Sequence, residues 1–326
     1  MVSIAVLGTG SIGSRHLSVL KKMSGVKPVA VPLRLSRRTE LKKQGFAIAS
    51  DLEDAYKLGC SLAIIATDTR RHVQDAKQAM ACGFTVLMEK PLARDAREAR
   101  SIAQIAKKKR LPLYVGCCLR FNDSLRTFKK QLHRIGMVHS VRIDYSSYLP
   151  DWRPHRDYRT SYSANRNEGG VLRDLIHEID YAGWIFGWPA RVLASLRNTG
   201  HLKINSEEAA DLHWTHRANE VSIHLDYLTR PSRRGMIAVG EHGTLMWNAL
   251  EQKVTLSLHG KSAQTLECKE DYNAMYERQA HAFIQASRKK TSDLATAAEG
   301  IKALAICDAA RISSKNHREV KINYGV

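Results

Sequence analysis

The sequence has no apolar stretch that approaches the roughly 20 residues needed to span a bilayer. It also has no basic leader with a small-residue cleavage site, because a strand-like segment, residues 2–7, begins at once. Its six cysteines show no metal-ligand spacing, and we expect reduced, buried thiols. These absences predict a cytoplasmic protein with no membrane segment and no metal site.

Acidic residues are scarce relative to basic ones. The chain has 51 Lys and Arg against 32 Asp and Glu, a formal net charge of +19. A basic protein can bind nucleic acid, but we find no nucleic-acid module, and clusters such as residues 107–110 lie at expected helix ends, where cations suit the helix dipole. We therefore expect no nucleic-acid partner and assign part of the charge to an anionic substrate or cofactor.

Length and pattern predict two domains in an α/β chain. The 326 residues suggest two domains at roughly 150 residues each. Residues 1–118 alternate strands and helices, which predicts a Rossmann domain with a parallel, doubly wound sheet. Residues 119–326 show short alternating strands between helices, which predicts an α+β domain for substrate binding and oligomerisation, with an open, mainly antiparallel sheet.

A glycine fingerprint, Gly8-x-Gly10-x-x-Gly13, follows the first expected strand and opens the first expected helix. Such glycines allow a tight turn, close approach to a pyrophosphate and close packing of helix on strand. The helix N-terminus supplies free N–H groups to phosphates. We therefore expect a dinucleotide to be bound here by Gly8, Gly10, Ser11, Ile12 and Gly13.

The second expected strand ends without the acidic residue that takes the ribose hydroxyls in NAD-binding folds. Its place is taken by a basic segment that can receive a 2′-phosphate. The residues of this segment that we expect to contact the cofactor are Arg34, Ser36, Arg37 and Arg38. The pattern favours NADP over NAD, and the alternative is that the arginines are a solvated helix start.

Two more loops follow expected parallel strands, and the carboxyl ends of such strands are where open α/β sheets bind ligands. The first contains Thr67, Asp68 and His72, and the second contains Glu89 and Lys90, which Pro91 follows. We expect both loops to contact the dinucleotide, and Lys90 also to orient the reacting oxygen and relay its proton. The alternatives are a helix-start histidine and a surface lysine at a strand end.

The second domain must supply an acid or base, because oxidation of an alcohol releases a hydroxyl proton. His177 is the main candidate, since its unperturbed pKa lies near neutrality. Asp174 precedes it by three residues and Asp180 follows by three, so each can share a helical face with it. The alternative is a satisfied core histidine with a structural aspartate.

A basic and aromatic loop begins at Trp152, and arginines bind carboxylate or phosphate while aromatic rings stack on sugars or bases. Arg230, Arg233 and Arg234 are further candidates for binding the substrate. Surface charge at the ends of strands explains them at least as well. A basic pocket favours an anionic sugar, sugar nucleotide or sugar acid. The expected substrate-binding residues are Arg120, Asn122, Trp152, Arg153, Arg156, Tyr158, Arg159, Arg173 and His177.

These motifs, in this order, resemble the Gfo/Idh/MocA oxidoreductases. The resemblance covers nearly the whole chain and includes four further stretches: Glu89-Lys90-Pro91-Leu92, Gly169-Gly170, Tyr272-x-x-x-Tyr276-x-x-Gln279 and Ala309-Ala310-Arg311-x-Ser313-Ser314. It implies a nicotinamide-dependent dehydrogenase of sugars, polyols or sugar nucleotides, with Lys90 beside nicotinamide and substrate. It also implies a homodimer or homotetramer formed through the open sheet.

One position departs from the family pattern. The catalytic aspartate more often lies four residues before the histidine, where this sequence has Arg173. This departure weakens the catalytic assignment of Asp174. Within the family, the loop sequences look similar to oxidoreductases of surface-polysaccharide and nonulosonic-acid pathways. The alternatives are a dehydrogenase of inositol or another polyol, and a cofactor-sensing regulator without turnover.

Overall fold

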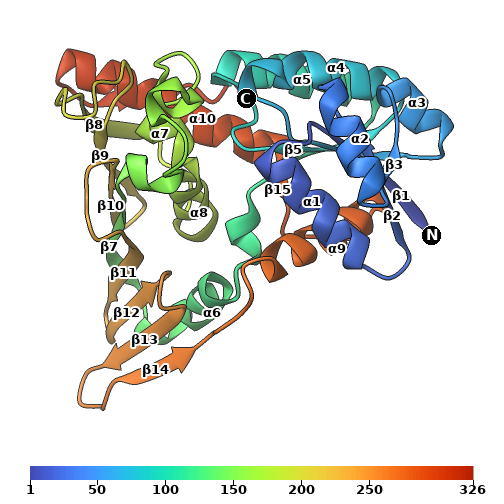
Figure 1. Ribbon diagram of the computed structural model, residues 1–326. Helices are drawn as coiled ribbons and strands as arrows, with labels where there is room; N and C mark the ends of the chain where they lie inside the picture. Colours follow the sequence, from blue (N-terminus) through green and yellow to red (C-terminus); the bar gives the residue numbers. More distant parts are fainter. Residues whose placement is uncertain (326) are drawn as a thin grey trace. The chain divides into compact units, whose positions relative to one another are not determined.

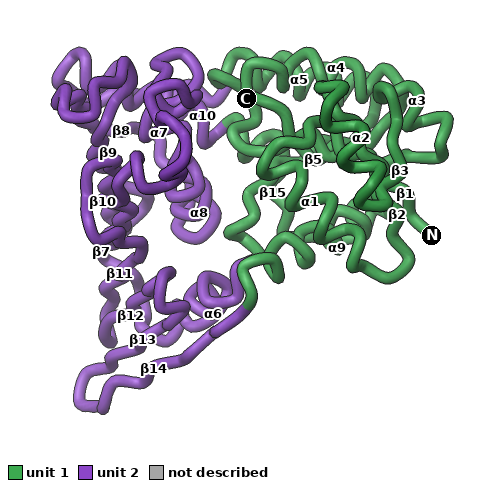
Figure 2. The backbone as a smooth tube through the Cα atoms, viewed as in Figure 1, with its two compact units in different colours: residues 1–121, 271–301 green, residues 122–270, 302–326 purple. Residues whose placement is uncertain are grey.

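The computed structural model describes residues 1–325, which divide into two compact units (Figure 2). Unit 1 comprises residues 1–121 and 271–301, and unit 2 comprises residues 122–270 and 302–326. The predicted division into 1–118 and 119–326 stays a prediction about domains. The units differ from it because residues 271–301 pack with the N-terminal part of the chain.

Unit 1 is built on a seven-stranded sheet in the order β15-β6-β5-β4-β1-β2-β3 (Figure 1). Its strands pair in parallel except β15, which runs antiparallel to β6. The strands are β1 (Val2–Leu7), β2 (Val26–Val31), β3 (Ala47–Ile48), β4 (Leu62–Ile65), β5 (Thr85–Glu89), β6 (Leu113–Gly116) and β15 (Ala295–Thr296). The helices are α1 (Ser11–Lys22), α2 (Leu35–Lys43), α3 (Leu52–Lys57), α4 (His72–Ala81), α5 (Ala96–Lys109) and α9 (Ala274–Ser287).

Local sequence explains these elements. The central strands are continuous apolar runs, as expected for parallel strands covered on both faces, and β4 is buried along its whole length. Asp51 caps α3 by accepting a hydrogen bond from the Asp54 amide at 2.8 Å. Gly83 has a φ of +90° just after α4, a left-handed conformation that glycine adopts without strain. The predicted Rossmann architecture is confirmed.

Unit 2 is built on a nine-stranded sheet in the order β14-β13-β12-β11-β7-β10-β9-β8-β16. Neighbouring strands are antiparallel except β7 and β10, which are parallel. The strands are β7 (Val138–Ser146), β8 (Arg191–Arg197), β9 (Ala209–His216), β10 (Asn219–Asp226), β11 (Arg233–Gly240), β12 (Gly243–Asn248), β13 (Lys253–Leu258), β14 (Gln264–Glu267) and β16 (Val320–Lys321). The helices are α6 (Asp123–Gln131), α7 (Val171–Asp174), α8 (Ile176–Phe186) and the C-terminal part of α10 (Ala297–Asn316).

The sheet of unit 2 alternates as a half-covered sheet should. In β9, Leu212 and Trp214 are buried, whereas His213 and Thr215 are exposed. Helices α6, α7 and α8 contact strands of this sheet, and Trp247 of β12 donates a hydrogen bond to the Ser124 hydroxyl of α6 at 2.7 Å. The predicted α+β architecture with a mainly antiparallel sheet is therefore confirmed.

The helical face predicted to be shared by Asp174 and His177 is not present. At Leu175 the backbone leaves the helical region, with φ −98° and ψ 28°, so a single turn, α7, ends at Asp174 and α8 begins at Ile176. Asp174 and His177 therefore do not lie on one face of a continuous helix.

The terminal Arg311-x-Ser313-Ser314 motif holds the fold of unit 2 together. Arg311 pairs with Glu207 at 2.7 Å. The hydroxyls of Ser313 and Ser314 accept hydrogen bonds from the backbone of β8, at Ala194 and Leu196. This part of the resemblance therefore has a structural explanation.

Among residues 1–325, no helix combines the length and the hydrophobicity that spanning a bilayer requires. No group of three or more His, Cys, Asp or Glu side chains in the same residues is arranged to hold a metal ion.

Candidate active site

The glycine fingerprint lies between β1 and α1, and two of its glycines are required by packing. A Cβ built on Gly13 would lie 1.9 Å from the Gly8 carbonyl oxygen, and one built on Gly8 would lie 2.7 Å from the Ala66 carbonyl oxygen. Gly8 also has a φ of +87°. Gly10 differs, because a Cβ there would meet no atom of residues 1–325 within 4 Å. The backbone at Gly10 therefore faces open space that a ligand can approach.

The start of α1 fits an anionic ligand. Its N-cap residue is Gly10, which offers no side chain to cap the helix, and the first turn contains no acidic residue. The backbone N–H groups of Ser11, Ile12 and Gly13 belong to this first turn, where N–H groups have no intrahelical acceptor. The residues present thus suit the pyrophosphate of a dinucleotide.

Arg37 lies against the fingerprint. Its guanidinium donates hydrogen bonds to the Thr9 carbonyl at 3.2 Å and the Ser14 hydroxyl at 3.0 Å, and it also pairs with Glu40. Arg38 instead donates to the Ser50 carbonyl at 3.1 Å, while Arg34 and Ser36 are exposed. Of the residues predicted to bind a 2′-phosphate, Arg37 is therefore the one whose side chain contacts the fingerprint loop, and its binding of a phosphate stays a prediction.

Lys90 follows β5 directly and is half-buried. Its backbone N–H lies 3.3 Å from a carboxylate oxygen of Glu89. The other Glu89 oxygen lies 2.6 Å from Nε2 of His16 on α1, and both side chains are buried. Glu89, predicted to bind the cofactor, is thus engaged with the protein, and its contact with a cofactor stays a prediction.

His72 is buried at the start of α4. Its Nδ1 lies 2.9 Å from the Pro91 carbonyl oxygen and its Nε2 lies 3.1 Å from the Thr67 carbonyl oxygen. Burial lowers the pKa of His72. The Thr67 hydroxyl donates to Asp75 at 2.7 Å, whereas Asp68 is exposed. Cofactor contacts of these loop residues stay predictions.

In unit 2, Asp174 is buried and accepts hydrogen bonds from two tyrosine hydroxyls, those of Tyr162 and Tyr227, the latter at 2.8 Å. Burial, with the Asp174 carboxylate, holds the pKa of Tyr227 far above its usual value, so it remains a donor. His177 is half-buried in the first turn of α8. The two tyrosines were not predicted, and no motif marks them, because Tyr227 is 53 residues from Asp174 and joins it only through the fold.

Arg173 is buried and donates to the Arg166 carbonyl at 3.1 Å. Burial, and then the nearby Arg311 charge, lower the pKa of Arg173. Neighbouring residues of one short turn therefore have separate surroundings. Asp174 accepts hydrogen bonds from two tyrosines, whereas Arg173 donates to the Arg166 carbonyl and lies near the charge of Arg311.

Some arginines in or beside the loop after β7 form ion pairs, and others do not. Arg159 pairs with Asp157 at 2.9 Å, and Arg230 pairs with Asp151 at 2.7 Å. The guanidinium groups of Arg153 and Arg156 are exposed and have no ion-pair or hydrogen-bond partner within residues 1–325. These two arginines are the ones in the loop with charge to offer a ligand.

The aromatic residues of this loop are anchored. Trp152 donates to the Ser147 hydroxyl at 2.9 Å and lies edge-on to the Tyr227 ring, with centroids 5.5 Å apart. Tyr158 donates to the Leu202 carbonyl at 3.1 Å. The loop thus reaches Asp174 through Tyr227 as well as through Tyr162.

Two predicted substrate residues serve the fold instead of standing open to solvent. Arg120 is buried and pairs with Glu299 at 2.8 Å within unit 1. Asn122 caps α6 by accepting from the Leu125 amide at 3.0 Å. Their contact with a substrate stays a prediction.

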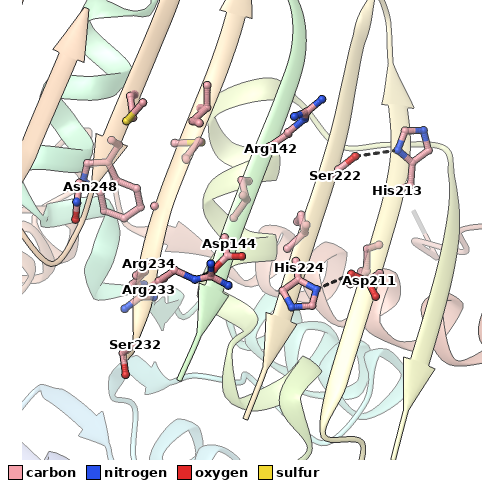
Figure 3. Close-up of a pocket in the computed structure, with 18 of the residues that line it drawn as sticks. Arg142, Asp144, Asp211, His213, Ser222, His224, Ser232, Arg233, Arg234 and Asn248 are labelled. Carbon is pink, nitrogen blue, oxygen red and sulfur yellow. Dashed lines mark hydrogen bonds and ion pairs between the residues drawn. The ribbon is translucent and has the colours of Figure 1, made fainter. Parts of the chain in front are cut away.

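A groove runs over the face of the unit 2 sheet that α6–α8 do not cover, and none of the candidate catalytic residues lines it (Figure 3). Charged side chains from neighbouring strands meet there, as His224 does with Asp211 at 2.6 Å (Figure 3). Exposed apolar side chains of Leu193, Ile237 and Met246 lie beside them. The groove is therefore a mixed apolar and charged surface, separate from His177.

His224 should make stability depend on pH. Hydrogen bonds to Asp226 and Asp211 raise its pKa from 6.5 to about 9. A raised pKa stabilises the fold fully below 6.5 and loses that effect as pH rises through about 9. We expect His224→Gln to lower the free energy of unfolding by about 1 kcal/mol at pH 6, allowing for solvent screening, and by almost nothing at pH 10. Urea unfolding across this range measures it. His213→Gln, on the same face, is the control, and a pH-independent difference for His224→Gln would contradict the assignment.

A Rossmann sheet with this fingerprint, in a chain with a second α+β unit, is the architecture of a dinucleotide-binding protein. Family comparison makes this specific. Residues 2–117 match the oxidoreductase family model for the NAD-binding Rossmann fold, and residues 129–322 match the model for its C-terminal alpha/beta domain. The chain belongs to the Gfo/Idh/MocA oxidoreductase family.

Individual relatives are distant. The chain is 24% identical to inositol 2-dehydrogenase of Rhizobium meliloti (strain 1021), over 98% of this chain and 99% of that protein. It is 25% identical to myo-inositol dehydrogenase Hyg17 of Streptomyces leeuwenhoekii, but that match spans only 56% of the relative's length. The solved structure of levoglucosan dehydrogenase with NADH and levoglucosan superposes with a TM-score of 0.87 at 18% identity, over 98% of this chain and 99% of that one.

These comparisons confirm the predicted family, enzyme class and nicotinamide cofactor. They do not show the finer resemblance to surface-polysaccharide and nonulosonic-acid enzymes, and the inositol 2-dehydrogenase above is a relative matched over nearly its whole length. That finer resemblance, the anionic substrate and the choice between NAD and NADP stay predictions.

Proposed function

We propose that this chain transfers a hydride between a nicotinamide dinucleotide and a carbon of a sugar or polyol, interconverting alcohol and ketone. The observation that carries the proposal is the open backbone at Gly10, at an uncapped helix N-terminus, in the unit whose β5 ends at Lys90. When bound, the nicotinamide supplies or accepts the hydride. The residues of the chain bind the dinucleotide, orient the substrate oxygen and move its proton.

In this proposal Lys90 and His177 have different chemical roles. Lys90, as a cation, orients the substrate oxygen and polarises it. His177 accepts the hydroxyl proton during oxidation and returns it during reduction. Asp174, whose oxygens accept from Tyr162 and Tyr227, assists as a fixed negative charge. The presence of both Lys90 and His177 favours an enzyme over a cofactor-sensing regulator, which needs neither.

The proposed dinucleotide is NADP, because Arg37 rests on the pyrophosphate loop and no acid ends β2. We expect Arg37→Ala to weaken NADPH binding about 10- to 100-fold, the effect of losing a hydrogen bond to a charged group, while NADH binding stays nearly constant. Fluorescence titration of both dinucleotides measures it, with Lys43→Ala at the end of the same helix as control. A wild-type preference for NADH would reject this choice.

The proposed substrate is an anionic sugar, sugar nucleotide or sugar acid, because Arg153 and Arg156 offer unpaired charge in the loop that reaches Asp174. A neutral polyol such as an inositol is the second candidate, and the full-length relative that is an inositol 2-dehydrogenase favours it. A surface-polysaccharide or nonulosonic-acid substrate is one form of the first candidate.

A substrate panel tests the proposal. Inositols, neutral sugars, sugar acids, sialic-acid-like sugars and sugar nucleotides are each incubated with the chain and NADP⁺ or NAD⁺, and the absorbance of the reduced nicotinamide is followed. We expect reduction with at least one class. Turnover of inositols alone would reject the anionic substrate, and no dinucleotide binding at all would reject the function.

Two further parts of the proposal concern the protein's state. We propose a homodimer or homotetramer formed through the groove face of the unit 2 sheet, whose exposed Leu193, Ile237 and Met246 suit a second copy. We also propose a cytoplasmic location, which suits six cysteines that form no disulfide among residues 1–325.

A further inference from the structure

Lys90 lies between two residues that are tied to different parts of unit 1. Before it, Glu89 contacts both the Lys90 N–H and His16, which lies three residues after Gly13 on the fingerprint helix. After it, the Pro91 carbonyl lies 2.9 Å from Nδ1 of His72. The backbone of Lys90 is therefore held on both sides by buried groups.

The ring of His72 also reaches a second loop. Its Nε2 lies 3.1 Å from the carbonyl of Thr67, which follows β4, while Lys90 and Pro91 follow β5. Strands β4 and β5 are parallel neighbours, so both loops leave the same edge of the sheet, the edge where such sheets bind ligands. One side chain, 1% exposed, thus links the two loops.

We propose that His72 is a positioning residue that couples the Thr67 loop to Lys90, so that a dinucleotide bound against the first fixes the second. This replaces direct contact between the His72 ring and the cofactor. The inference rests on the proposed function only where it names the dinucleotide, because the link between the two loops belongs to the chain itself.

The chemistry of the ring decides which link is stronger. Both contacts are carbonyl oxygens, and a neutral imidazole donates from only one nitrogen. Burial lowers the pKa of His72, against the opposing effect of the Thr67 and Pro91 carbonyls and the Glu89 carboxylate, and favours the neutral ring. We assign its one proton to Nδ1, which makes the shorter contact, with the Pro91 carbonyl. In this tautomer His72 holds the turn after Lys90 by a hydrogen bond, and Nε2 packs against the Thr67 carbonyl without donating to it.

This assignment allows variants that each keep one of the two contacts of His72 and remove the other. The amide of asparagine can place an N–H near the position of Nδ1, and that of glutamine can place one near Nε2. His72→Asn should keep the link to Pro91, whereas His72→Gln keeps only the contact with Thr67 and His72→Leu keeps neither. His133→Asn is the matched control, because that exposed histidine of unit 2 also contacts a backbone carbonyl, that of Lys130.

The readout is the reactivity of the Lys90 amine in the full chain. Trinitrobenzenesulfonate labelling is followed by peptide mass spectrometry across pH, without dinucleotide and with NADPH. We expect His72→Gln and His72→Leu to change the Lys90 labelling rate about 3- to 10-fold, the factor that corresponds to one neutral hydrogen bond, and to weaken its response to NADPH. His72→Asn should match the wild type without dinucleotide but should respond less to NADPH, because it keeps the link to Pro91 and loses the contact with Thr67. His133→Asn should match the wild type in both conditions. Urea unfolding identifies any variant that fails to fold.

The inference is overturned if folded His72→Gln labels Lys90 at the wild-type rate at every pH. Equal changes in His72→Asn and His72→Gln without dinucleotide would also overturn it, because they would show a general packing effect. A wild type that binds no dinucleotide would remove the proposed function and the coupling, while labelling without dinucleotide would still decide whether His72 positions Lys90.

Discussion

Lys90→Met and His177→Asn are each expected to lower turnover by about 10²–10⁴-fold, the range for losing a positioned proton-transfer or polarising group. Methionine keeps much of the lysine stem without its charge, and asparagine keeps polarity without an imidazole. Neither residue belongs to the glycine fingerprint, so both variants should still bind NADPH, and His177→Asn, which changes a residue of unit 2, should alter the affinity by less than about threefold. Steady-state kinetics on the best panel substrate, with NADPH titration alongside, measures both quantities.

The control for this pair is Lys109→Met, which removes an exposed lysine at the end of α5. It should leave both turnover and dinucleotide binding unchanged. If Lys90→Met and His177→Asn both turn over at near-wild-type rates, the assignment of the proton-transfer residues is wrong, even if the chain is an oxidoreductase.

Two alanine substitutions in the fingerprint are expected to impair different properties, one the stability of the fold and the other the binding of NADPH. Gly13→Ala forces a methyl group to within 1.9 Å of the Gly8 carbonyl oxygen, so we expect unfolding to become easier by about 3 kcal/mol. Gly10→Ala meets nothing within residues 1–325 and has an ordinary φ of −72°, so stability should change by less than about 1 kcal/mol. Its methyl group instead occupies the space proposed for the pyrophosphate, and we expect NADPH binding to weaken about 10- to 100-fold.

Urea unfolding and NADPH titration of both variants separate the two effects. A Gly10→Ala variant that folds and binds NADPH as the wild type does would contradict the placement of the pyrophosphate. A fully stable Gly13→Ala variant would contradict the packing of α1 on the fingerprint turn.

Sequence patterns predicted most of the Rossmann unit because its signals are local. Apolar runs marked the strands, Asp51 and Gly83 marked helix ends, and three glycines marked the ligand loop. The family resemblance extended this to the α+β unit. These features depend on residues near one another in the chain, and there a single sequence is informative.

The parts that sequence did not predict depend on distant contacts. Nothing local shows that Leu175 breaks a helix, or that Tyr227 donates to Asp174. The contacts of His72 with Pro91 and Thr67, and of Glu89 with His16, also join distant residues and could not be predicted, while cofactor binding by His72 and Glu89 stays a prediction. A motif marks a functional region, but only the fold shows which of its residues face a ligand and which hold the others in place.

Transfer of deuterium tests the central claim most directly. NADPH carrying deuterium at both hydrogen positions of C4 of the nicotinamide is incubated with the ketone form of the best panel substrate, and the product is examined by mass spectrometry and NMR. The account predicts one deuterium on the newly formed carbinol carbon with the wild type, and almost none in the same time with His177→Asn. Product formed by the wild type without deuterium at that carbon would contradict hydride transfer by this chain.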